Sequence, residues 1–388
     1  MTSPSKPGQI ADVGIVGGGQ LARMTAERAA KLGLTVAVLD PAADCAAGGF
    51  AQIHIRSAFD DAAGLRRLVE CSRVTTFDIE LADAKALLQL EAEGQLIWPR
   101  PTVLATLQDK LQQREFLAAR GLPVPRFADL PEASAETFEA FGYPLVQKAR
   151  RGGYDGRGVA VLNDSSELDR ALTARSMVEE KIEIDREFAA LVSRNRRGQI
   201  ASYPIAEMYP DPETHVLEAL TFPAQIDPDM QVAAQRLAES AVESLSGVGI
   251  FAVELFLDKA GRLLINEISP RPHNAGHVTL DAAATCQFEQ HLRAILDLTP
   301  GDTRVVSAAA MVNLLGPPNV RGAVRIEHLQ PVMEIPGARL HLYGKTSSWP
   351  GRKLGHLTVV DPDPIHALER AREARSRLQF VAVREAVA

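Results

Sequence analysis

The stretch FAVELFLDKAGRLLINEISPRPHNAGH, residues 251–277, decides how the rest of the chain is interpreted. Its halves FAVELFLD and RLLINEI are rich in β-branched and large apolar residues, and the segment between them is typical of a turn, so we expect a β-hairpin. With Ala260 and Gly261 as a two-residue turn, counting back along both strands places Glu254 opposite Glu267. Two carboxylates at that distance repel each other unless a cation lies between them. The hairpin therefore predicts either a Mg²⁺–phosphate site or an ordinary solvated strand face that carries two acids.

Composition limits the class of protein. The chain has 388 residues and 46% hydrophobic content, which favours two or three domains with substantial cores. A net charge of −7 argues against a nucleic-acid or membrane-surface partner, and no apolar run is long enough to span a bilayer. The three cysteines are far apart and lack metal-binding spacing, which predicts reduced thiols. We expect a cytoplasmic globular enzyme.

The first part of the chain has the pattern of a βαβ unit. ADVGIVGGG reads as a buried strand that ends in glycines, QLARMTAERAAKLG as an amphipathic helix, and LTVAVLD as a second strand. Gly17, Gly19 and Ala22 fit the G-x-G-x-x-G/A spacing, which alone indicates an NAD-dependent dehydrogenase. A glycine turn at a helix N-terminus can bind any phosphate, so another phosphorylated ligand or a purely structural turn are the alternatives.

Two later segments carry polar residues at strand ends. The strand RVTTFDIE ends with Asp78 and Glu80, and ligands of open α/β sheets gather at such ends, so Glu80 is a candidate substrate contact or a surface acid. After a helix expected from about Thr106 to Arg120, the strand FGYPLVQKAR leads through Lys148 into RGGYDGRGV. Glycine-rich backbone can form an anion-binding nest, so this loop is either a flap over ATP phosphates or a mobile surface hairpin.

The last polar segment is KTSSWPGRKLGH. Lys345, Arg352 and Lys353 surround a glycine-containing turn in it, and such cations bind phosphate or carboxylate groups. A basic surface loop is the alternative interpretation.

Several of these motifs occur in order along nearly the whole chain: GGGQLARM, QKARRGGYDGRG, NEISPRPHNAGH, QFEQHLRAI, MVNLLG and YGK…GRKLGH. Together they resemble the ATP-grasp superfamily and, within it, the 5-(carboxyamino)imidazole ribonucleotide synthase family. The resemblance implies an α/β and α+β protein. An N-terminal Rossmann-like (pre-ATP-grasp) domain would cover residues 1–107 and an ATP-grasp domain residues 108–300, with a lid subdomain at about 122–182. A small C-terminal β-rich domain would cover residues 301–388.

The resemblance also implies an activity. Members of this family are ligases of purine biosynthesis that form a carboxyphosphate from ATP and bicarbonate. The amine of aminoimidazole ribonucleotide then captures the carboxyl group, forming a C–N bond. The expected cofactors are ATP and Mg²⁺, with Mn²⁺ as a substitute, and the expected assembly is a homodimer. Another ATP-grasp carboxylase, a formate-dependent ribonucleotide transformylase and an NAD-binding oxidoreductase are the alternatives.

The resemblance assigns roles to individual residues. The ATP site would contain Lys110, Lys148, Gly153, Tyr154, Asp155, Gly156, Arg157, Gly158, Val159, Glu179, Glu180, Lys181, Ile182, Glu187, Asn266 and Glu267. Glu254 and Glu267 would bind the metal, and Asn266 would help, although a regular strand would turn it to the opposite face. Carboxyl transfer would involve Tyr154, Asp155, Arg271, His273, Asn274 and Lys353. The ribonucleotide would contact Gly19, Gln20, Leu21, Glu80, Lys345, Arg352 and Lys353.

One long segment departs from the family pattern. The loop between Glu207 and Pro223 is longer than usual and lacks the family's Asn-x-His element. We expect the nucleotide to be covered differently on that side.

Overall fold

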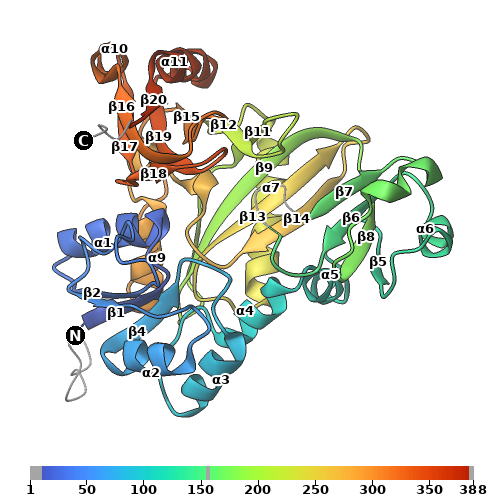
Figure 1. Cartoon of the computed structure of the whole chain (residues 1–388), viewed down its shortest axis with the longest axis horizontal. Coiled ribbons are helices and arrows are strands. Elements are labelled where there is room, and N and C mark those ends of the chain that lie inside the picture. Colours follow the sequence, from blue (N-terminus) through green and yellow to red (C-terminus); the bar gives the residue numbers. More distant parts are fainter. Residues whose placement is uncertain (1–10, 154–157, 384–388) are drawn as a thin grey trace, which may run out of the picture.

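The computed structural model describes residues 11–153 and 158–383, and within these ranges the strands form four β-sheets (Figure 1). The first sheet is parallel, with the strand order β3-β2-β1-β4, which confirms the Rossmann-like start of the chain. Its glycine turn connects the carboxyl end of β1 to α1. The elements of this part are β1 (Ala11–Val16), α1 (Gln20–Lys31), β2 (Val36–Leu39), β3 (Ile53–Ile55), α2 (Ala62–Glu70), β4 (Ser72–Phe77), α3 (Ala84–Ala92) and α4 (Pro101–Gln108).

A smaller antiparallel sheet follows, with the order β5-β8-β6-β7. Leu145, Leu162 and Val178 bury one face of it against Phe138, so this unit has a core of its own. β6 ends at Ala149 and β7 begins at Val159, and the two strands pair antiparallel. The elements here are α5 (Lys110–Ala118), β5 (Phe127–Leu130), α6 (Ala135–Phe141), β6 (Leu145–Ala149), β7 (Val159–Leu162), the short 3₁₀ helix η1 (Ser165–Arg170) and β8 (Ser176–Glu180).

The helix expected from Thr106 to Arg120 is broken. α4 ends at Gln108 and α5 begins at Lys110, because Asp109 has extended backbone angles (φ −111°, ψ 112°). The Asp109 side chain accepts hydrogen bonds from the backbone N–H groups of Leu111 and Gln112, so it caps α5. The break places Lys110 at the first position of a new helix.

The third sheet is the largest and has the order β14-β13-β9-β11-β12-β15-β19-β17, with β10 paired to β9. β12 pairs with β15, so the strands of the expected C-terminal domain extend this sheet, and no break in the sheet separates them from the ATP-grasp part. Its first elements are β9 (Ile184–Arg194), β10 (Ile200–Ser202), β11 (Ala206–Pro210), β12 (Leu217–Phe222), α7 (Pro228–Ser244), β13 (Gly249–Asp258), β14 (Leu263–Ser269), η2 (Asn274–Gly276), α8 (Thr279–Ala282) and α9 (Gln287–Ile295).

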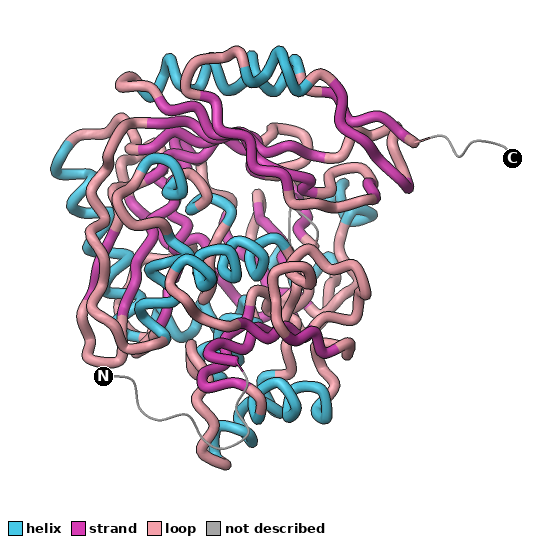
Figure 2. Tube along the Cα trace, turned by 90° about the vertical axis from the view of Figure 1, so that its left-hand side faces the viewer, coloured by secondary structure: helices cyan, strands magenta, loops and turns pink. Residues whose placement is uncertain are grey.

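The C-terminal strands are covered by helices. Ala367, Ala371 and Ala374 of α11 pack against β15 and β19, and Figure 2 shows helices lying over the strands at the top of the view. A three-stranded sheet with the order β18-β16-β20 completes this region. Its elements are β15 (Ala309–Leu315), β16 (Gly322–Glu327), α10 (Leu329–Met333), β17 (Ala338–Leu342), β18 (Ser347–Ser348), β19 (Lys353–Val360), α11 (Pro364–Arg377) and β20 (Gln379–Ala382).

The hairpin that opened the sequence analysis pairs Glu254 with Glu267 as predicted, but for a different reason. The turn has three residues, since the N–H of Asp258 donates to the carbonyl of Arg262, and this shifts Leu255 opposite Ile265. A β-bulge at Asn266 then inserts one extra residue into β14 and brings Glu254 back opposite Glu267. The two-residue turn and the regular strand were both wrong, and the two errors cancel.

His291 joins the Rossmann-like part to the central sheet. Its Nδ1 accepts the backbone N–H of Ile250 at 3.2 Å, so Nε2 carries the proton and donates to Thr76 Oγ1 at 2.8 Å. Burial lowers the pKa of His291 to about 3. Among the described residues, none of the helices has both the length and the apolarity that crossing a membrane requires.

We predict that the contribution of His291 to stability is lost in acid. The unfolded imidazole titrates near pH 6.5 and the folded one near 3, so the unfolded state binds more protons between these values. From pH 7.5 to pH 5.5 this group should cost about 1 kcal/mol of unfolding free energy. Thermal unfolding of wild type and His291→Gln at both pH values checks it, and the variant should show the smaller decrease. An equal decrease in both proteins would contradict this account.

Candidate active site

One face of the central sheet carries the two acids of the hairpin. Glu254 and Glu267 are directly opposite each other, and Lys110 Nζ lies 2.5 Å from Glu267 Oε2. Burial and, next to it, the neighbouring charge of Glu267 together raise the pKa of Glu254 to about 7. Burial also acts to raise the pKa of Glu267, but the Lys110 ammonium outweighs it and the pKa is lowered. The Lys110 ammonium thus balances the negative charge of Glu267, while Glu254 binds a proton more readily than an ordinary glutamate does.

A second lysine reaches the same face from β6. Lys148 Nζ donates to Asn266 Oδ1 at 3.2 Å and is 2.6 Å from Glu179 Oε2. Asn266 Nδ2 in turn donates to Glu254 Oε2 at 3.3 Å. The bulge therefore turns Asn266 toward the acids, which corrects the expectation that it faces away.

Glu179 has a different environment from the one expected. It is buried and forms ion pairs with Lys148 and Arg114. Burial acts to raise its pKa, yet the two cations lower the pKa to about 2. Because its carboxylate is engaged by these cations, an adenine contact from the bend 179–182 would have to come from the backbone or from the neighbouring residues. Of these, Glu180 accepts the N–H of Arg126, and Lys181 donates to Asn163.

The donor set on this face suits Mg²⁺. Glu187 lies on β9 beside β13, and its register puts it on the face of Glu254 and Glu267. Carboxylate and amide oxygens are the protein ligands that Mg²⁺ uses, together with substrate phosphates. No group of three or more His, Cys, Asp or Glu side chains within residues 11–153 and 158–383 could hold a metal by itself. A metal here would depend on phosphate oxygens as further ligands.

The loop after β14 forms the next part of the site. Arg271 Nε lies 2.7 Å from Glu80 Oε1, which forms an ion pair without a well-directed N–H···O bond. Burial acts to lower the pKa of Arg271, but Glu80 raises it, so the guanidinium stays charged. His273 Nε2 is 3.4 Å from Glu254 Oε1, which connects this loop to the metal face. The sequence analysis placed Glu80 with the ribonucleotide and Arg271 with bicarbonate, and the structure puts them in contact.

Two residues that the sequence analysis missed hold this loop. The Gln287 side chain accepts the N–H of His273 and donates to its carbonyl, at 2.9 and 2.8 Å. Asn274 and Asn313 exchange two carboxamide hydrogen bonds, at 2.9 and 2.7 Å, and Asn313 also donates to the Leu217 carbonyl. The Asn274 amide, which we expected beside bicarbonate, is largely committed to Asn313.

A cleft of about 1000 Å³ lies between the Rossmann-like part and the C-terminal strands. It is lined by most of the residues that the sequence analysis assigned to the ribonucleotide: Gly19, Gln20, Lys345, Arg352 and Lys353. Lys345 Nζ donates to Gln20 Oε1 at 2.9 Å and so connects the two walls. The segment expected to be a long loop after Glu207 is a hairpin of β11 and β12, and its turn lines this cleft through Asp211, Glu213 and Thr214.

The glycine turn is filled by the chain's own carboxylates. Asp40 accepts the N–H of Gly18, and Asp78 accepts those of Gly19 and Ala22. A Cβ on Gly17 would lie 1.6 Å from the Asp78 carboxylate, so the close approach of Asp78 requires glycine there. Burial raises the pKa of Asp78 to about 7. A phosphate at this turn would therefore compete with Asp78 for the Gly19 amide.

Some predicted residues lie elsewhere. The Leu21 side chain is buried in a cluster with Met24, Phe288 and Tyr343, so it holds α1 against α9. Tyr154, Asp155, Gly156 and Arg157 lie outside the described residues. The Gly158 carbonyl accepts the N–H of Ala149, and Val159 begins β7 opposite Lys148. Gly153 is the last described residue before that gap.

We predict that nucleotide binding with Mg²⁺ depends on pH through Glu254. Metal binding needs the ionised carboxylate, while the free site favours its proton below pH 7. Affinity for Mg²⁺–ADP should fall about tenfold per pH unit below 7, with one proton released on binding. Calorimetry at pH 6 and pH 8 in buffers of different ionisation enthalpy measures this, and Glu254→Gln should abolish the proton release. A binding enthalpy at pH 6 that is independent of the buffer would contradict the prediction.

We also predict that Asn274 and Asn313 act as one unit. Replacing either by alanine leaves a buried carboxamide without its partner, while replacing both removes that penalty. The losses in unfolding free energy should therefore be strongly non-additive, with a coupling energy of about 1 kcal/mol or more. Chemical denaturation of the two single variants and the double variant tests it, and additive losses would show that the two amides act separately.

Comparisons with known proteins agree with this geometry. Residues 10–108 match the ribonucleotide synthetase preATP-grasp domain, residues 115–288 the ATP-grasp domain, and residues 309–370 the phosphoribosylaminoimidazole carboxylase C-terminal domain. The chain is 41% identical over 379 residues to the N5-carboxyaminoimidazole ribonucleotide synthase of Synechococcus elongatus. That alignment covers 96% of this chain and 95% of the relative.

Solved structures give the same result. The N5-carboxyaminoimidazole ribonucleotide synthetase of Thermotoga maritima is 42% identical, with a TM-score of 0.90 over 96% of this chain and 100% of that one. An Aspergillus clavatus N5-carboxyaminoimidazole synthase, in complex with ADP and 5-aminoimidazole ribonucleotide, is 31% identical, with a TM-score of 0.85 over 95% of this chain and 99% of that one. The chain therefore belongs to the N5-carboxyaminoimidazole ribonucleotide synthase family of ATP-grasp ligases.

Proposed function

We propose that the chain carboxylates 5-aminoimidazole ribonucleotide with ATP and bicarbonate, through carboxyphosphate, and releases ADP and phosphate. The observation that carries this proposal is one continuous polar surface. It runs from Lys148 and Lys110, past Glu267 and Glu254, through His273 and Arg271, to Glu80. The cleft lined by Lys345 and Arg352 reaches this region at Gly19, whose N–H donates to Asp78, two residues before Glu80. Phosphoryl transfer, carboxyl transfer and ribonucleotide binding each find suitable groups along this surface.

In the first step, a bicarbonate oxygen forms a bond to the γ-phosphorus of ATP, and the bond from that phosphorus to ADP breaks. Lys110 and Lys148 would bind the phosphates, and Glu254, Glu267 and Asn266 would hold Mg²⁺. When bound, Mg²⁺ neutralises phosphate charge and aligns the phosphates for transfer. Arg271 stays charged beside Glu80 and would balance the charge of the carboxyphosphate.

In the second step, the amine nitrogen of the ribonucleotide forms a bond to the carboxyl carbon. The carbon–oxygen bond to phosphate breaks, and the leaving phosphate takes up the proton that the amine loses. Carboxyphosphate hydrolyses in water, so the pocket must exclude water around it. Arg352 and Lys345 would hold the ribonucleotide phosphate in the cleft, and Lys353, at the start of β19, would face the reacting carboxyl group.

The glycine turn argues against an NAD-binding oxidoreductase. In dinucleotide-binding folds the pyrophosphate accepts hydrogen bonds from the backbone N–H groups of this turn. In this chain the Asp40 and Asp78 carboxylates accept those hydrogen bonds, from the backbone N–H groups of Gly18, Gly19 and Ala22. A pyrophosphate would have to displace both carboxylates and would be repelled by them.

Two further properties are part of the proposal. We propose that the enzyme acts as a homodimer, on the basis of the family resemblance, and that it works in the cytoplasm. Cys45, Cys71 and Cys286 are free thiols, which fits a reducing compartment.

The central experiment measures ADP and carboxylated product together, with the ribonucleotide and with or without bicarbonate. Both should appear in equal amounts and only when bicarbonate is present. Glu267→Gln removes an ionised ligand while keeping the shape of the side chain, so turnover should fall at least about 10²-fold.

Glu183→Gln is the matched control, because the Glu183 side chain is 81% exposed and lies away from the acids of the hairpin. Its turnover should equal that of wild type. ADP release by wild type that ignores both bicarbonate and ribonucleotide would overturn the proposed function.

A further inference from the structure

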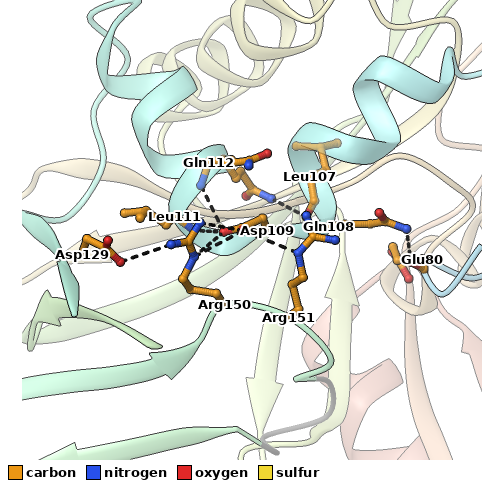
Figure 3. A network of polar contacts seen from close by, with 10 residues as sticks. Glu80, Leu107, Gln108, Asp109, Leu111, Gln112, Asp129, Arg150 and Arg151 are labelled. Atoms are coloured by element: carbon orange, nitrogen blue, oxygen red, sulfur yellow. Dashed lines mark hydrogen bonds and ion pairs between the residues drawn. The ribbon is translucent and has the colours of Figure 1, made fainter. Parts of the chain in front are cut away.

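Three consecutive residues at the break between α4 and α5 reach three different parts of the site, and Figure 3 shows the contacts of the first two, Gln108 and Asp109. Gln108 Nε2 donates to the carbonyls of Glu80 and Ala82, at 2.6 and 2.7 Å. Asp109 accepts from the guanidinium of Arg150, with its closest contact at 2.8 Å to Nη2. Lys110 forms its ion pair with Glu267. The chain thus contacts the Rossmann-like part, the small sheet and the central sheet within three residues.

The Asp109 carboxylate has two separate tasks. It caps α5 through the backbone N–H groups of Leu111 and Gln112, and it binds Arg150 through both Nε and Nη2. Asp109 is only 4% exposed, so the Arg150 contact is poorly screened by water. Arg151 Nε, at 3.5 Å, adds a second and longer contact.

The Asp109–Arg150 pair fixes the distance between the two lysines that face the acids. Lys110 directly follows Asp109, and Lys148 lies two residues before Arg150 at the end of β6. A backbone hydrogen bond from the Lys110 N–H to the Arg150 carbonyl, at 2.8 Å, ties the same two segments together. The small sheet, which carries Lys148, is thereby held against the helix that carries Lys110.

Gln108 positions the segment that carries Glu80, in the Rossmann-like part. Its two hydrogen bonds hold the backbone on both sides of Leu81, directly beside Glu80. Glu80 in turn pairs with Arg271. The position of Arg271 relative to Lys110 therefore depends on this side-chain amide.

We propose that Gln108 and Asp109 are positioning residues. They hold the groups for phosphoryl transfer and the groups for carboxyl transfer at a fixed distance from each other. Asp109 sets the two lysines at the phosphates, and Gln108 sets the Glu80–Arg271 pair at the carboxyl acceptor. This proposal rests on the proposed function, which assigns those two sets of groups. Neither residue touches a substrate, so each acts only through its neighbours.

The test of Asp109 uses Asp109→Asn. Asparagine keeps the cap of α5 but removes the charge that Arg150 binds, so folding should be preserved while Lys148 loses its fixed position. KM for ATP should rise about tenfold, with KM for the ribonucleotide within about twofold of wild type. The melting temperature should fall, because Arg150 loses a buried charge partner, but the variant should still fold cooperatively. Asp129→Asn is the matched control: Asp129 is a partly exposed second partner of Arg150, at 3.3 Å, and its loss should leave KM for ATP unchanged.

The test of Gln108 uses Gln108→Met, which keeps side-chain length and removes both donors. The split should be reversed, with kcat/KM for the ribonucleotide about tenfold lower and KM for ATP within about twofold of wild type. Gln112→Met, at an exposed position of α5, is the control and should behave as wild type.

The outcomes separate the two proposals. If wild type carboxylates the ribonucleotide but Asp109→Asn and Gln108→Met change both KM values equally, or if Asp129→Asn matches Asp109→Asn, the positioning role is overturned. If wild type lacks the activity, the proposed function itself fails. Binding of Mg²⁺–ADP then still reports on Asp109: tenfold weaker binding by Asp109→Asn supports its role at the phosphates, and unchanged binding overturns it.

Discussion

The repulsion between Glu254 and Glu267 is the constraint on which the rest of the site depends. Two carboxylates directly opposite each other on a half-buried face repel each other strongly unless cations lie nearby. The chain meets this constraint with Lys110 and, through Asn266, with Lys148, and it leaves Glu254 with a pKa of about 7. The helix break at Asp109, the bulge at Asn266 and the buried Arg114–Glu179 pair all serve to bring cations to this place. A metal with its phosphates would take over a task that ammonium groups perform in the free protein.

The sequence predicted which side chains form the site better than it predicted the backbone features that bring them together. Glu254, Glu267, Lys110 and Lys148 converge as expected, because strand pairing and family motifs constrain them locally. The bulge was missed because no single residue type demands one, and the pairing was right only because the turn was also one residue longer. The break at Asp109 did leave a signal: an aspartate three residues before Gln112, a spacing typical of a helix N-cap. The helical spacing of apolar residues continues across Asp109, so the segment was interpreted as one helix.

Two supporting residues lie in the family motifs QFEQHLRAI and MVNLLG, but the sequence did not show what their side chains contact. Asn313 lies on β15, 39 residues after Asn274 in the short helix η2, and neither residue indicates that its amide will meet the other. Gln287 looks like an ordinary residue at the start of α9, yet it holds both sides of the His273 backbone. Such contacts follow from how sheets and helices are stacked, which local patterns do not encode. The glycine turn makes the same point: its spacing fits a dinucleotide site, while the buried Asp40 and Asp78 give it a different use.

The pairing of β12 with β15 has a mechanical consequence. Because the hydrogen-bond ladder runs unbroken from β14 to β17, the wall of the cleft that carries Lys353 and the hairpin that carries Glu254 belong to one rigid plate. Rotation between them would break a row of backbone bonds together. Freedom to open and close is left to the joints that no strand pairing crosses, at the small sheet of β5–β8 and at the Rossmann-like part. Truncating the chain before β15 would expose β12 as a long apolar edge, the kind of surface on which chains stack into aggregates.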